Sequence, residues 1–167
     1  MSKTPATDPA AVLLDFEDWA THRMLDACGT LSDEQLDMEF EMGLGSLRKT
    51  LVHNLGAMIG WTGVLEDGEP EFAPDFGSDP PSIDRIRACH DQAMTRFRNA
   101  GSADFADVLA PERKGTTYRF TRGGIVTHVV THSMHHRAQC LNMLRRLGVD
   151  PQPESSVFQW MIAHPPG

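Results

Sequence analysis

The sequence lacks the features that mark several specialised classes of protein. No apolar run approaches the length of a membrane-spanning helix, and the first residues contain no apolar segment of the secretory kind. The three cysteines, Cys28, Cys89 and Cys140, form no Cys-x-x-Cys pair, so neither a disulfide framework nor a cysteine zinc site is indicated. No basic cluster offsets the net charge of -8, which argues against a nucleic-acid partner. We therefore expect a cytoplasmic protein that binds neither nucleic acid nor membranes.

The length and composition are typical of one globular domain. A chain of 167 residues can bury a sizeable core but is short for two domains. Hydrophobic residues make up 40% of the chain and charged residues 23%, which are ordinary values. No internal repeat or low-complexity tract is present. We expect residues 1–167 to form a single helical domain.

Apolar residues recur at helical spacing in four long segments, each with start or stop signals. The first helix begins at Pro9 with Asp8 as its N-cap, and Gly29 is its stop. The other three run from Ser46 to about Glu66, from Ser82 to residues 99–101, and from just beyond Thr121 to residues 147–148.

Shorter elements fill the rest of the chain. The Ser32-Asp-Glu-Gln35 sequence is a capping box for a short helix that ends near Phe40. Residues 116–121 could pair briefly as a strand, and residues 156–162 could add one or two helical turns. With four long helices and little strand signal, the sequence predicts an all-α four-helix bundle.

The connection between the second and third long helices is unusually long. Residues 67–81 contain four prolines and five carboxylates, which predicts an irregular acidic linker. Extended, it could span roughly 50 Å, whereas a helix of about twenty residues is only about 30 Å long. The third long helix could therefore run parallel to the second. The linker could cover a site as a lid or remain a solvated connection.

Histidines concentrate in the last long helix, where His128, His132, His135 and His136 lie within nine residues. His132 and His136 are about 40° apart around a helix and fall on its apolar stripe. An unpaired imidazole facing the interior is costly, and neutral imidazole is the commonest protein ligand for transition metals. The pair could instead be two core histidines bonded to each other or to backbone carbonyls. His128 and His135 lie at the margin of the stripe.

A metal site with an open position typically uses three protein ligands, so a third must come from another segment. His53 is the best candidate, because it interrupts the apolar pattern of the second long helix. Its neighbours on the same face are small and leave room for the imidazole: Thr50, Gly56, Ala57 and Gly60. The alternative is a polar residue at a helix interface. Three neutral histidines suit zinc, nickel, iron or manganese, and the sequence does not distinguish these ions.

The remaining candidates carry less weight. We expect His128 to orient a ligand or to be half-buried at the surface, and His135 to face solvent or a subunit contact. Gln139 could orient a metal-bound water or fill the end of the bundle. Cys140 is expected to be a packed thiol. Three histidines without companions at ligand spacing are expected at the surface, and three tryptophans in the core or at a dimer contact: His22, His90 and His164; Trp19, Trp61 and Trp160.

These motifs resemble the DinB-like (DinB/YfiT) metalloenzyme family, most of whose members have no assigned reaction. The resemblance covers almost the whole chain. The family places one histidine midway along its second helix and a His-x-x-x-His pair in its fourth, and Ala138 stands where it usually has glycine. The matching segments here are residues 19–23, 31–35, 46–53 followed by Trp61, and 132–139 followed by Leu141, Leu144 and Leu147-Gly148.

The resemblance implies a fold, a site and a class of reaction. The helices would run up-down-down-up, and His53, His132 and His136 would hold a divalent metal ion with open positions for water or substrate. Relatives in the wider superfamily act as thiol-dependent S-transferases or isomerases with low-molecular-weight thiols, and such bundles often form homodimers. We expect a metal-dependent transferase or hydrolase acting on a small molecule. The alternative is a non-catalytic metal-binding or stress-response module with a closed site.

Overall fold

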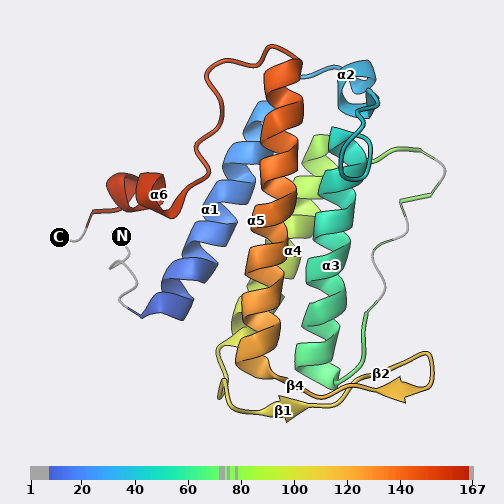
Figure 1. The fold of residues 1–167 in the computed structure, drawn as a ribbon, viewed down its shortest axis with the longest axis vertical. Helices are drawn as coiled ribbons and strands as arrows, with labels where there is room; N and C mark the ends of the chain where they lie inside the picture. The colour runs from blue at the N-terminus through green and yellow to red at the C-terminus, as the bar shows by residue number, and fades with distance from the viewer. Residues whose placement is uncertain (1–7, 72–73, 75, 78, 166–167) are drawn as a thin grey trace.

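Four long helices pack side by side as a bundle in the computed structural model (Figure 1). The structure describes residues 8–71, 74, 76–77 and 79–165. The bundle helices are α1 (Pro9–Cys28), α3 (Leu47–Asp67), α4 (Ile83–Gly101) and α5 (Arg122–Arg146). Two short helices accompany them, α2 (Asp33–Asp37) and α6 (Val157–Ala163).

The predicted caps define the ends of these helices. The Asp8 carboxylate accepts hydrogen bonds from the first backbone N–H groups of α1, and Ser32 forms the predicted capping box with Gln35. At the end of α3, Gly68 has a φ of 82°, a left-handed conformation that glycine adopts without strain. The short helix α2 ends at Asp37, earlier than the predicted end near Phe40.

The helices run up-down-down-up, as the colour gradient of Figure 1 shows. The chain ascends in α1, descends in α3 and again in α4, and ascends in α5. The described residues of the linker lie along the outside of α3, between the end of α3 and the start of α4, so the predicted order of helix directions is confirmed (Figure 1).

Glycines in α3 accommodate the beginning of this linker. A Cβ atom on Gly63 would lie 2.6 Å from the Glu71 backbone nitrogen, and the Gly60 carbonyl accepts a hydrogen bond from that nitrogen at 3.4 Å. The small residues of α3 therefore make room for a loop. The question of whether the linker acts as a lid falls partly on residues 72–73, 75 and 78, which lie outside the described residues.

The segment between α4 and α5 forms two small antiparallel pairs. Strand β1 (Val108–Leu109) pairs with β4 (Phe120–Thr121), and β2 (Glu112–Arg113) pairs with β3 (Thr116–Thr117). The prediction of one strand over residues 116–121 was therefore only partly right, because the segment turns and contributes to two pairs.

A polar network is buried in the bundle behind the predicted metal site. Glu17 of α1 is fully buried, and Arg137 of α5 donates from Nη1 to its Oε2 atom at 2.6 Å. The Ser133 hydroxyl donates to the other Glu17 oxygen and accepts from the Asn54 amide of α3 at 2.8 Å. Three of the four long helices are thus joined through polar groups, of which Glu17, Ser133 and Arg137 are buried and Asn54 is partly buried.

No helix within the described residues has both the length and the apolar character needed to cross a bilayer.

Replacing Glu17 by glutamine should destabilise the fold strongly, because Arg137 would keep a buried charge without a counter-ion. We expect the free energy of unfolding in urea to fall by about 3–5 kcal/mol. Glu154→Gln is the matched control, since Glu154 pairs with Arg23 at 3.6 Å where both side chains are about half exposed. That loss should stay within about 0–1 kcal/mol. Equal losses in the two variants would contradict a structural role for the Glu17 pair.

Candidate metal centre

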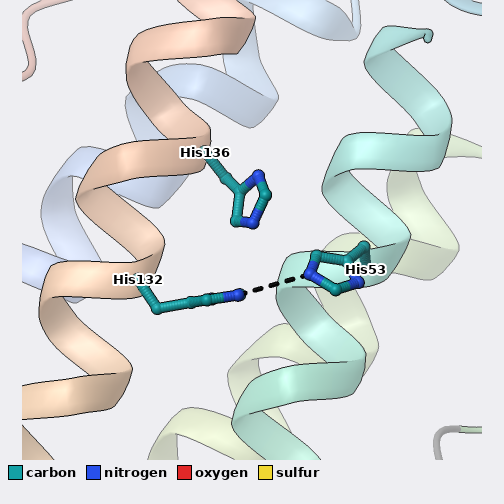
Figure 2. A group of neighbouring side chains, drawn as sticks. All are labelled: His53, His132 and His136. Carbon is teal, nitrogen blue, oxygen red and sulfur yellow. Dashed lines mark hydrogen bonds between the residues drawn. The ribbon is translucent and has the colours of Figure 1, made fainter. Parts of the chain in front are cut away.

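Three histidines from two helices meet at one point on the bundle (Figure 2). His53 comes from α3, whereas His132 and His136 come from successive turns of α5. The Nε2 atoms of His53 and His132 are 3.3 Å apart, and one ring nitrogen of each histidine lies within 4.8 Å of the others. The structure therefore brings together the three predicted ligands.

The spacing and the chemistry of these side chains fit a transition-metal ion. Two imidazole nitrogens at zinc-like distances of about 2.0–2.1 Å, at a tetrahedral angle, are about 3.3–3.4 Å apart. The observed Nε2–Nε2 separation of 3.3 Å agrees with that value. The hydrogen bond between these two Nε2 atoms requires a proton on one of them, whereas a shared cation would satisfy both lone pairs.

The buried network holds the two helices in the orientation that the site needs. Ser133 follows His132, Arg137 follows His136, and Asn54 follows His53, and all three of these neighbours belong to the network around Glu17. Because adjacent residues are about 100° apart around a helix, fixing these side chains inward also fixes the direction of the histidines.

The three histidines differ in their exposure to solvent. His136 is 9% exposed, His132 is half-buried and His53 is exposed. The predicted interior position of the α5 pair is therefore right for His136 and partly right for His132. The exposed ring of His53 leaves the cluster accessible from solvent.

Gln139 orients His136. Its Oε1 atom accepts from His136 Nδ1 at 2.9 Å, and its amide nitrogen lies 3.1 Å from His135 Nε2. With its proton on Nδ1, His136 presents an unprotonated Nε2 atom to the other two histidines. A Cβ atom on Gly43 would lie 2.4 Å from Gln139 Oε1, so a side chain there would displace the Gln139 amide from its present position. From the sequence, Gln139 was expected either to orient a metal-bound water or to fill the end of the bundle. Neither interpretation included a hydrogen bond to His136.

The other histidines of α5 stay outside the ligand set. His128 is exposed, and its ring packs 5.2 Å from that of Trp61 and 5.7 Å from that of His132. His135 is exposed, as expected, but also contacts Gln139. Both residues support the site from its edge.

Cys140 and Trp160 have the packing roles expected of them. Cys140 is buried, and burial raises the pKa of its thiol; burial also raises the pKa of Cys28 to about 12. Neither thiol is a thiolate at neutral pH. Trp160 packs with Phe16 in a small apolar cluster.

Sequence reasoning missed Glu17 and wrongly placed His90. Glu17 falls on the apolar stripe of the first helix, three residues before Ala20 and seven before Met24, and that carboxylate among apolar residues was the available signal. His90 is only 3% exposed, so its assignment to the surface was wrong. It packs against His22, whose ring centroid is 5.5 Å away, whereas the predicted exposure of His164 is confirmed.

Two of the three clustered histidines have lowered pKa values. Burial, together with the neighbouring His136 and His53, lowers the pKa of His132 to about 4. Burial, followed by the neighbouring His136, also lowers the pKa of His53. Both imidazoles are therefore neutral at pH 7, the form in which histidine binds metal.

The lowered pKa of His132 predicts acid sensitivity of the metal-free protein. Below pH 6.5, the pKa of an unperturbed histidine, His132 binds a proton in the unfolded chain. In the folded protein the same side chain stays neutral until about pH 4. Stability should therefore fall as the pH drops from 6.5 towards 4. Urea denaturation of chelator-treated protein should show a shallower fall in His132→Asn than in the wild type. Identical pH dependence in both proteins would contradict the assignment.

Comparison with known proteins places this chain in a family. No curated protein sequence is significantly similar to the chain. A crystal structure of a DinB-like protein from Bacillus subtilis superposes with a TM-score of 0.67 at 11% identity, covering 86% of this chain and 96% of that one. A DinB-like protein from Bacillus cereus ATCC 10987 superposes with a TM-score of 0.59 at 22% identity, covering 89% and 95%.

These two likenesses show the fold. The family follows from the sequence, since the profile of the DinB family matches residues 1–161. This match covers almost the whole sequence, and the chain belongs to the DinB family.

Proposed function

We propose that His53, His132 and His136 hold one divalent metal ion with an open coordination position, and that the protein is a metal-dependent enzyme acting on a small molecule. The observation that carries this proposal is the convergence of the three imidazoles from two helices, with His53 and His132 Nε2 atoms 3.3 Å apart. Zinc, nickel, iron and manganese all suit such ligands.

The number of ligands favours catalysis over a structural role. Among the residues that the structure describes, no fourth histidine, cysteine or carboxylate joins this group. Structural zinc sites usually have four protein ligands, whereas catalytic sites have three and an open position. The exposure of His53 gives solvent and small molecules access to that position, which disfavours the closed site of a non-catalytic module.

The reactions that fit best are S-transfer from a low-molecular-weight thiol and hydrolysis. A divalent ion held by His53, His132 and His136 would lower the pKa of a water or thiol in its open position and would so supply a nucleophile at neutral pH. In S-transfer the thiol sulfur forms a bond to an electrophilic carbon, the leaving group departs with its electron pair, and the thiol proton passes to solvent. Gln139 keeps His136 correctly oriented throughout, and the Glu17 network holds α3 against α5.

The metal content of untagged protein, purified without added metal, tests the ligand set. We expect His53→Asn and His132→Asn each to lose one equivalent of divalent metal by elemental analysis, while His164→Asn, an exposed histidine outside the cluster, loses none. Circular dichroism would verify the folding of each variant. Unchanged metal content in folded His53→Asn protein would overturn the proposed site.

Activity should follow the same pattern. Metal-loaded protein is expected to turn over members of a panel of thiol-conjugation and ester-hydrolysis substrates, with activity lost in chelator and in His132→Asn. Metal binding without turnover of any substrate would reject the enzymatic part of the proposal and favour the non-catalytic module.

Removing the acceptor that orients His136 should weaken metal binding without removing a ligand. In Gln139→Leu, competition with a chromophoric chelator should show an affinity about 10- to 100-fold lower. Gln139→Glu keeps an oxygen for His136 Nδ1 and should retain most of the affinity. Equal affinities in the leucine and glutamate variants would contradict this role for Gln139.

A further inference from the structure

A second cluster of metal-ligating side chains lies between α1 and α4, on a different pair of helices from the three-histidine site. Asp18 and His22 are one turn apart on α1, and His90 projects from α4. One potential ligand atom from each lies within 4.8 Å of the others. His22 Nδ1 is 3.3 Å and His90 Nε2 is 3.5 Å from the same oxygen, Asp18 Oδ1.

The side chain of His90 has an unsatisfied polar atom at this cluster. Its side chain is almost fully buried, and its Nε2 atom has no hydrogen-bond partner within the described part of the chain. A buried polar atom left without a partner costs about 1–3 kcal/mol. The Asp18 oxygen at 3.5 Å is too far for a good hydrogen bond, but the two atoms are close enough to bind a common ion.

His22 has a neighbour that would orient it as a ligand. Its Nε2 atom is 2.9 Å from Asp91 Oδ1, while its Nδ1 atom faces Asp18. Metal-bound histidines almost always donate their other ring N–H to a carboxylate or carbonyl. Binding through Nδ1 would keep the contact with Asp91 and replace the bond that Nδ1 now makes to the Asp18 carbonyl at 2.8 Å.

Space and charge at the cluster also suit a cation. A cavity of about 270 Å³ borders Asp18, His22 and Asp91, which leaves room for coordinated water or a small ligand. Asp15, Asp18 and Asp91 supply three carboxylates, against one guanidinium from Arg98, which pairs with Asp15 and lies 3.5 Å from Asp18 Oδ2. With neutral histidines the surroundings carry excess negative charge.

We propose that Asp18, His22 and His90 form a second site for a divalent transition-metal ion. Two imidazoles and one carboxylate with open positions are the ligand set of non-haem iron(II) sites, and the same combination occurs in catalytic zinc sites. The competing description is a protonated His22 paired with Asp18 and Asp91, without any metal.

The test separates this site from the three-histidine site. The full-length protein carrying His53→Asn and His132→Asn, stripped with chelator, is titrated with Co²⁺ and followed by its visible absorption and by elemental analysis. One equivalent should still bind. Adding Asp18→Asn or His90→Asn should abolish that binding, and Asp91→Asn should weaken it about 10- to 100-fold.

Asp26→Asn is the matched control, because Asp26 also joins α1 to α4, through Arg87 at 2.7 Å, but lies outside the cluster. Its binding should equal that of the parent. Asp18 is half-buried, so Asp18→Asn gives a usable result if the buried His90 variant does not fold. Absence of Co²⁺ binding in the folded parent, or Co²⁺ binding that is unaffected by Asp18→Asn, would overturn the proposal. The three-histidine site is tested separately, by the metal content of wild-type and His53→Asn protein.

Discussion

The buried ion pair between Glu17 and Arg137 determines which way the histidines of α5 face. Replacing a buried ion pair by apolar residues often leaves a protein equally stable, so a contribution to stability does not by itself explain the presence of this pair. The geometry of the pair orients α5. Arg137 is held towards α1, and the preceding residue, His136, is thereby turned towards α3. Ser133 and Asn54 complete the same connection beside His132 and His53.

The site also depends on a loop outside the bundle helices. Gln139 holds the proton of His136 on Nδ1, and its amide can occupy that position only because Gly43 has no side chain. Gly43 adopts a φ of 53°, which glycine tolerates and most residues do not. The loop before α3 therefore influences the orientation of His136 without belonging to the three-histidine cluster.

The parts of the fold that could be predicted from sequence are those decided by local chemistry. The caps at Asp8 and Ser32 and the helical spacing of His132 and His136 depend on residues within one or two turns. The contact between Gln139 and Gly43 could not be foreseen in this way, because it depends on how a loop folds over a helix. His90 was misplaced for the same reason, since its companions lie on another helix.

The net charge of a bound ion together with its ligands would differ between the two clusters. Three neutral imidazoles leave the full charge of a divalent cation, and the nearby Glu17 and Arg137 cancel each other. Such an ion favours an anionic ligand such as hydroxide or thiolate in its open position. In the cluster of Asp18, His22 and His90 the carboxylate already offsets one charge, so an ion there would polarise a ligand less. Of the two proposed sites, the three-histidine centre would therefore be the better suited to nucleophile activation.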